Sequence, residues 1–250
     1  MLYSLVELTR ASMLPWRAAA NATRRSLRAG WNPAGDTLPG RATAAAADMF
    51  ESLTRYYGKP EWGLSPQDVN GVSVPHEIES VWSKPFCNLI GFKRDRAALA
   101  KARGVRQGAI DDPKVLIVAP VSGHHATLLR GTVEAFLPDH EVYITDWTDA
   151  RRVPVIEGRF DLEDYVEYVR EMITAVGPGA HVVAVCQPGP PTLAAIALMA
   201  EDDDPCAPAS MTFMGSPIDA RKSPTVPNKL AEERPYAWFR DNLIHTVPAI

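Results

Sequence analysis

Cys186 stands at a position from which many enzymes present a nucleophile. It follows a short apolar run at residues 181–185 (HVVAV) and precedes Gln-Pro-Gly and an alanine-rich helical pattern at residues 192–200. Strand, tight turn and helix in this order are typical of a nucleophile elbow, which raises a reactive side chain above the carboxyl edge of a parallel sheet. The usual motif is G-x-S-x-G, but here Ala184 and Pro188 occupy the glycine positions and sulfur replaces the hydroxyl oxygen. The pattern predicts a cysteine nucleophile, with a buried structural thiol as the alternative.

A cysteine nucleophile needs hydrogen-bond donors for the charge that develops on the carbonyl oxygen under attack. The backbone N–H of Gln187, directly after the cysteine, is the first expected donor of this oxyanion hole. The second should come from the loop after the first parallel strand, where Ser122 and Gly123 lie. His124 in the same loop and Asp146 at the end of another strand are candidates for positions beside the site. For Asp146, a loop cap or an ion pair is the alternative.

An acid and a base should complete such a site. In α/β-hydrolases they follow the nucleophile along the chain, first the acid and then the histidine. After Cys186 only one further strand is expected, at residues 211–215, and the only later candidates are Asp219, Asp241 and His245. A triad of Cys186, Asp219 and His245 would lack the two strands that should carry its acid and its base. We therefore expect no triad aspartate or histidine within these 250 residues.

Apolar strands alternate with helices in the middle of the chain. Strands are expected at residues 114–120 and 141–147, with a helix at residues 126–137 between them. A strongly amphipathic helix that begins at Asp161 is expected at residues 161–176. Its apolar face is expected to consist of Leu162, Tyr165, Val166, Val169, Ile173 and Val176. Such βαβ units predict an α/β fold with a mostly parallel sheet that is covered on both faces.

The chain divides into three parts by its patterns. Residues 1–68 are a helical extension, residues 69–217 are the α/β core with two or three antiparallel strands at its start, and residues 218–250 are proline-rich and irregular. In the extension, helices are expected at residues 1–29 and 41–57.

The first 30 residues combine basic and apolar side chains with a single acid, Glu7. This composition is typical of a basic amphipathic helix on an apolar surface or of an organelle transit peptide, and a helix docked on its own domain is the alternative. The side chains concerned are Arg10, Arg17, Arg24, Arg25 and Arg28, with Leu2, Leu5, Leu8, Met13 and Leu14.

Composition excludes several function classes. The hydrophobic share of 46% and the charged share of 22% are ordinary for a soluble protein, and the net charge of −4 gives no reason to expect a nucleic-acid partner. Cys87, Cys186 and Cys206 lack the spacing of a metal site, so we expect no metal, no cofactor and a reducing, cytoplasmic compartment. No apolar run is long enough for a transmembrane segment, and no secretory signal is visible.

Several segments of the chain resemble one enzyme family when they are taken together. They are VCQP (185–188), APVSGHHATLLRGTVE (119–134), ITDWTDARRVP (144–154) and FDLEDYVEYV (160–169), with weaker likeness at residues 1–17, 57–62 and 81–94. The family is that of the intracellular polyhydroxyalkanoate depolymerases, which are the poly(3-hydroxybutyrate) (PHB) depolymerases of bacterial storage granules.

The resemblance implies an α/β-hydrolase fold that is incomplete at its C-terminus. It also implies hydrolysis of amorphous polyester at the granule surface through a thioester on Cys186. The family's catalytic aspartate and histidine come from a C-terminal portion that these residues do not contain. Residues 235–248 resemble the entry into the family's cap, so residues 218–250 are expected to begin a cap or lid and His245 to match a cap histidine. We therefore expect a truncated depolymerase, of uncertain activity by itself, with a homo-oligomer left open.

Other functions remain open at this point. A polyester synthase shares the fold and the cysteine chemistry, but its elbow resembles G-x-C-x-G and both glycines are missing here. A non-catalytic granule-surface protein would keep the fold without the triad. A thiol-dependent esterase is the third alternative.

Overall fold

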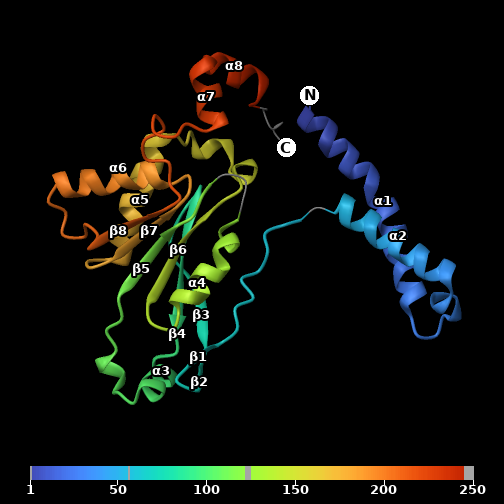
Figure 1. The fold of residues 1–250 in the computed structure, drawn as a ribbon, viewed down its shortest axis with the longest axis horizontal. Helices are drawn as coiled ribbons and strands as arrows, with labels where there is room; N and C mark the ends of the chain where they lie inside the picture. Colours follow the sequence, from blue (N-terminus) through green and yellow to red (C-terminus); the bar gives the residue numbers. More distant parts are fainter. Residues whose placement is uncertain (1, 56, 122–124, 245–250) are drawn as a thin grey trace. The chain divides into compact units, whose positions relative to one another are not determined.

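The computed structural model describes residues 2–55, 57–121 and 125–244 (Figure 1). It divides into two units, each described by itself below. The sheet unit comprises Lys59–Pro224, and the helical unit comprises Met1–Gly58 with Thr225–Ile250. Among the described residues, no helix combines the length and the apolar character needed to cross a membrane.

A mixed six-stranded sheet lies at the centre of the sheet unit, in the order β3-β4-β6-β5-β7-β8. The pairs β3–β4 and β4–β6 are antiparallel, and β6, β5, β7 and β8 run parallel. The α/β class expected from the sequence is confirmed. The strands are β3 (His76–Lys84), β4 (Cys87–Arg94), β5 (Lys114–Val118), β6 (Glu141–Trp147), β7 (His181–Val185) and β8 (Ser210–Met214).

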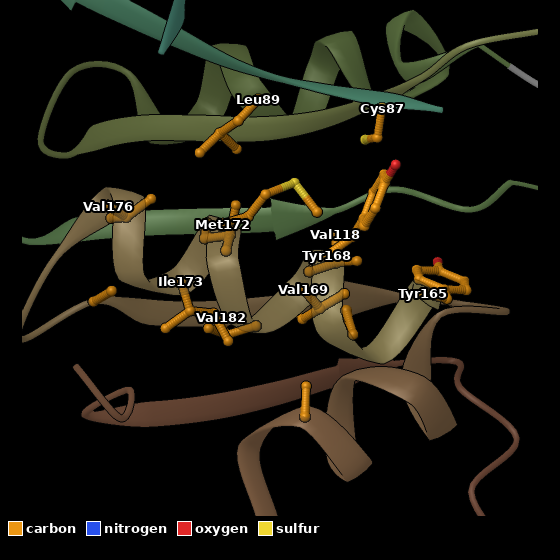
Figure 2. Close-up of a cluster of buried hydrophobic side chains, with 14 of the residues drawn as sticks. Cys87, Leu89, Val118, Tyr165, Tyr168, Val169, Met172, Ile173, Val176 and Val182 are labelled. Atoms are coloured by element: carbon orange, nitrogen blue, oxygen red, sulfur yellow. The ribbon is translucent and has the colours of Figure 1, made fainter. Parts of the chain in front are cut away.

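Helices cover both faces of this sheet. On one face, α4 (Arg130–Phe136), which follows a 3₁₀ turn at Ala126–Leu129, packs against Val115 and Ile117 of β5. On the other face, α5 (Leu162–Val176) and α6 (Gly189–Glu201) pack against Leu116 and Val118 of the same strand. The two faces alternate along β5 because successive side chains of a strand point to opposite sides. Figure 2 shows the cluster on the α5 side, into which β4 contributes Cys87 and Leu89.

The amphipathic helix α5 begins as its sequence predicts. Asp161 accepts a hydrogen bond from the backbone N–H of Asp164, and the Asp164 side chain accepts one in return, which forms a capping box. The buried face differs from the prediction at one end. Leu162 is 62% exposed, whereas Tyr168 and Met172 are buried. Leu162 is the first residue of the helix.

The antiparallel region contains four strands rather than the two or three expected. A separate hairpin is formed by β1 (Gln67–Val69) and β2 (Val72–Val74), joined by Asn70 and Gly71, both with positive φ. Such a pair of residues is typical of a tight two-residue hairpin turn. Helix α3 (Arg96–Arg103) packs against this hairpin through Leu99.

The helical unit contains a helical hairpin of α1 (Leu2–Arg28) and α2 (Leu38–Thr54), connected through a 3₁₀ turn at Pro33–Asp36. Helix α2 starts three residues before its predicted start because Thr37 caps it by accepting a hydrogen bond from the N–H of Gly40. Acidic side chains of α2 bind arginines of α1. Asp48 pairs with Arg24 and Arg28.

The C-terminal segment is not irregular, as the sequence had led us to expect. It contains α7 (Val226–Glu233) and α8 (Tyr236–Asn242). Pro227 lies in the first turn of α7 and Pro235 is the N-cap of α8. Proline is tolerated at these positions because the backbone N–H groups there have no partner within the helix. Short 3₁₀ turns at Gln107–Ala109, Ala150–Arg152 and Val155–Glu157 complete the described elements.

Candidate active site

The turn after β7 holds Cys186 in a backbone conformation that is rare for a residue with a side chain. Its φ is +67°, in the left-handed region, which costs of order 1–3 kcal/mol for a non-glycine residue. The Cys186 N–H donates to the carbonyl of Met214 at 2.9 Å, and the Cys186 carbonyl accepts from the N–H of Gly189 at 3.3 Å. The thiol residue is exposed. The predicted sequence of strand, turn and helix is therefore present, and the strained residue within it is the cysteine.

Close packing beneath the elbow depends on Gly189. A Cβ atom at this position would lie 2.4 Å from the Cβ of Ser216, which follows β8. The Ser216 hydroxyl in turn donates to the carbonyl of Ala184 at 3.3 Å. The glycine that the local geometry requires thus lies one residue after Pro188. Helix α6 begins at Gly189, three residues earlier than predicted, because two prolines fit its first turn.

The elbow lies at the edge where the order of the sheet reverses. From the central strand β5 the chain passes first to β6 on one side and later to β7 on the other. Ligands of open α/β sheets bind outside the carboxyl ends of the strands at such a switch point. The end of β7 with Cys186, the end of β5 and Asp146 near the end of β6 all lie at this edge.

The loop after β5 is joined to the elbow by a side chain. The side-chain carbonyl of Gln187 accepts a hydrogen bond from the backbone N–H of Val121 at 3.1 Å. Among the described residues, no hydrogen bond occupies the backbone N–H of Gln187, the first predicted oxyanion donor. Ser122, Gly123 and His124 lie outside the described residues, so their predicted roles stay predictions.

Asp146 is a buried acid at the same edge, only 5% exposed. It forms an ion pair with Lys59, so the alternative interpretation of this residue is present in the structure. Its Oδ1 atom is buried and has no hydrogen-bond partner among the described residues. This ion pair fixes the start of the sheet unit against the carboxyl end of β6. That Asp146 lies beside the reacting groups stays a prediction.

Among residues 2–55, 57–121 and 125–244, the structure joins no acid or base to Cys186 by a hydrogen bond. Within the described part of the chain, the Cys186 thiol has no hydrogen bond to a histidine or a carboxylate. Asp219 binds Arg221, whose hydrogen bonds hold the pKa of this carboxyl below its usual value. Asp241 pairs with its neighbour Arg240. His245 lies outside the described residues.

The two other cysteines have different environments. Cys87 is fully buried in the cluster beside α5, and burial raises the pKa of its thiol well above the usual value (Figure 2). A thiol of this kind stays protonated and is a poor nucleophile. Cys206 is partly buried beside the same cluster. Of the three, only Cys186 is exposed.

A cavity of about 210 Å³ lies away from this edge. Its lining includes Glu141, the first residue of β6, and Arg94, the last residue of β4. Because β6 runs from Glu141 toward Asp146, this cavity lies at the opposite end of the strand from the elbow. We therefore do not assign the chemistry to it.

A comparison with known families identifies the segment that follows β8. The chain's residues 215–250 match a family model described as "PHB de-polymerase C-terminus". Residues 215–250 are therefore similar to the C-terminal part of PHB depolymerases. The match begins directly after β8, so the elbow lies outside the matched residues. The comparison with curated proteins finds no match.

Two features of the candidate site were missed from the sequence. The Gln187 side chain joins a segment 66 residues away, and Lys59 reaches Asp146 across 87 residues. Neither residue has a local pattern that could have revealed its partner. The positive φ of Cys186 had a signal, because the elbow pattern itself requires a strained turn.

Proposed function

We propose that this chain hydrolyses the ester bonds of a polyhydroxyalkanoate polyester, with Cys186 as the nucleophile in an α/β-hydrolase fold. One observation carries the proposal, namely the exposed Cys186 with a φ of +67° at a strand-to-helix turn. Such strain persists only where the surrounding structure enforces it, and it is found preferentially at functional sites. The family match supports the polyester as the substrate class.

The order of the strands supports the α/β-hydrolase fold. Along the chain, β5 is the third strand of the six-stranded sheet, and the nucleophile follows β7. In α/β-hydrolases one oxyanion donor comes from the loop after the third strand and the other from the residue after the nucleophile. Here the corresponding segments are in contact through Gln187 and Val121. We assign the oxyanion donors to the N–H of Gln187 and to the loop of Ser122 and Gly123.

The reaction proceeds by acyl transfer in two steps. The Cys186 sulfur, as thiolate, attacks the ester carbonyl carbon, and a C–S bond forms while the carbonyl oxygen gains negative charge between the donors. The C–O bond to the leaving alcohol then breaks, and the alkoxide takes up a proton. Water next attacks the thioester, which releases a hydroxy acid or oligomer and restores the thiol.

A base is needed to activate both the thiol and this water. No hydrogen bond joins the Cys186 thiol to such a base among the described residues, so we expect slow acylation and slower deacylation. The acyl-enzyme should then accumulate, which makes it observable.

The test is acylation of the purified chain by p-nitrophenyl butyrate and by amorphous PHB, followed by intact-protein and peptide mass spectrometry. On the peptide that contains Cys186 we expect one butyryl group from the p-nitrophenyl ester, and one 3-hydroxybutyryl monomer or oligomer from PHB. Cys186→Ala should take none, and Cys206→Ala, the matched control, should be acylated like the wild type. Acylation of the Cys186→Ala variant to the wild-type extent would overturn the proposal.

We also propose that the helical unit contacts the polymer granule in the cytoplasm. Its hairpin exposes large apolar side chains, among them Leu8 (68%) and Trp16 (65%). Exposed apolar side chains on a helix favour contact with an apolar surface. Three of the arginines in this part of the chain, Arg17, Arg24 and Arg28, bind acids of α2. The apolar side chains therefore carry this part of the proposal.

A further inference from the structure

The end of β5 is held in place by one neighbour on each side. Its ladder with β6 ends at Ile117 and its ladder with β7 ends at Val118. Beyond these residues, the segment is held by hydrogen bonds to side chains instead of by backbone pairing. On the β6 side, the N–H of Ala119 donates to the Thr145 hydroxyl at 2.9 Å, and the Trp147 indole donates to the Ala119 carbonyl at 2.9 Å.

On the β7 side, the only such bond among the described residues is that of Gln187. Pro120 has no N–H to donate. The next donor along the chain is the N–H of Val121, and it is bound to Gln187 Oε1 at 3.1 Å. Because this N–H is already bound, it is not available as an oxyanion donor.

Gln187 is well suited to hold another segment because its own backbone is constrained on both sides. Cys186, before it, is fixed in the left-handed region by bonds to Met214 and Gly189. Pro188, after it, is buried and has a ring that fixes φ, which is −71° here. The side-chain amide therefore extends from a rigid point toward the loop.

We infer that Gln187 is a positioning residue, whose side-chain carbonyl ties the start of the loop after β5, at Val121, to the nucleophile elbow. The inference rests on the proposed function. It gives Gln187 two separate tasks, because its backbone N–H is the proposed oxyanion donor while its side chain holds Val121. A displacement of about 1 Å in such a donor can cost about 100-fold in rate.

Two isosteric variants separate these tasks. Gln187→Met keeps the backbone N–H and the length of the side chain but has no carbonyl to accept the bond. Gln187→Glu keeps an acceptor oxygen. We expect the Val121 amide, measured by residue-resolved hydrogen exchange of the full chain, to lose protection in Gln187→Met and to keep it in Gln187→Glu. Equal protection of Val121 in the wild type and Gln187→Met would overturn the inference.

The role in catalysis is measured by two reactions of the same thiol. Acylation by p-nitrophenyl butyrate passes through an oxyanion, whereas alkylation by iodoacetamide does not. Gln187→Met should lower the acylation rate about 10- to 100-fold and leave alkylation unchanged. Parallel loss of both rates, or an unchanged acylation rate, would overturn the positioning role. If the wild-type thiol is alkylated but never acylated, the proposed function fails, and Val121 exchange still decides whether Gln187 holds the loop.

Discussion

The helical hairpin and the sheet unit place charged and apolar side chains in opposite ways. In the sheet unit, apolar side chains such as Leu116 and Ile144 are fully buried. In the hairpin, the buried residues of α2 include an acid, Glu51, which contacts Arg17 and Arg55, while Leu53 is 75% exposed. The hairpin is thus joined by ion pairs and close backbone packing more than by an apolar core.

This difference fits the two roles proposed above, which are to hold the reactive cysteine and to contact the polymer surface. A buried apolar core gives the sheet unit the rigidity to hold a strained residue such as Cys186, since strain persists only where many contacts enforce it. The hairpin buries little apolar surface within itself and leaves much of it exposed. An exposed apolar surface of this extent is typical of a part that contacts another surface.

The largest expected effect is a difference in stability loss between two leucine-to-alanine substitutions, one in the sheet unit and one in the hairpin. Leu116→Ala should destabilise the sheet unit by about 2–5 kcal/mol, because it leaves a cavity in a fully buried site. Leu53→Ala on α2 should change stability by no more than about 0.5 kcal/mol. Hydrogen exchange of β5 and α2 peptides under increasing urea measures the two units separately. Comparable losses of stability in the two variants would contradict the view that only the sheet unit has a packed apolar core.

Tight packing should extend to the elbow itself. Gly189→Ala would place a Cβ 2.4 Å from that of Ser216, and we expect a loss of about 1–3 kcal/mol together with slower acylation of Cys186. Gly131→Ala is the matched control, because a Cβ at that position of α4 meets nothing within 4 Å. It should stabilise the helix by about 0.5–1 kcal/mol. A tolerated Gly189→Ala would show that the elbow is looser than the core.

The outer surface of the hairpin should bind amorphous PHB particles. Replacing Leu8 and Trp16 together by serine should weaken sedimentation with the particles by about tenfold, because binding loses apolar contact area. Val155 and Ile156 of the sheet unit, 90% and 91% exposed, provide a matched double serine control that should bind normally. Equal loss in both variants would mean nonspecific adhesion rather than a binding surface on the hairpin.

The smallest effect concerns pH. Hydrogen bonds from Arg55, with further contact from Arg17, lower the pKa of Glu51. A carboxylate with a lowered pKa in the folded state contributes stability above its unfolded pKa of about 4.3, and this contribution is lost as the pH falls through the folded value. Exchange protection of α2 should therefore fall on acidification below about pH 4. Glu51→Gln should lower this protection at pH 6 and reduce its dependence on pH in that range, while the ion pairs of Asp48 remain.

Much of the fold could be predicted from local patterns. The strand at residues 141–147 was predicted with its observed ends, and the cap of α5 at Asp161 follows from a short-range motif. The two C-terminal helices were missed because a proline is taken to end a helix unless it is known to lie in the first turn of one. The exposure of Leu162 was missed because periodicity shows which side chains share a face but not which of them the neighbouring elements cover.

The candidate site divides in the same way. By itself, the sequence determined that Cys186 follows a strand and precedes a helix, because strand, turn and helix patterns are encoded within about a dozen neighbouring residues. Only the tertiary structure decided that Gln187 holds Val121, that Lys59 pairs with Asp146, and that arginines of α1 bind acids of α2. These contacts join residues far apart in the chain, and their partners are chosen by the order and register of the packed elements, which no local pattern specifies.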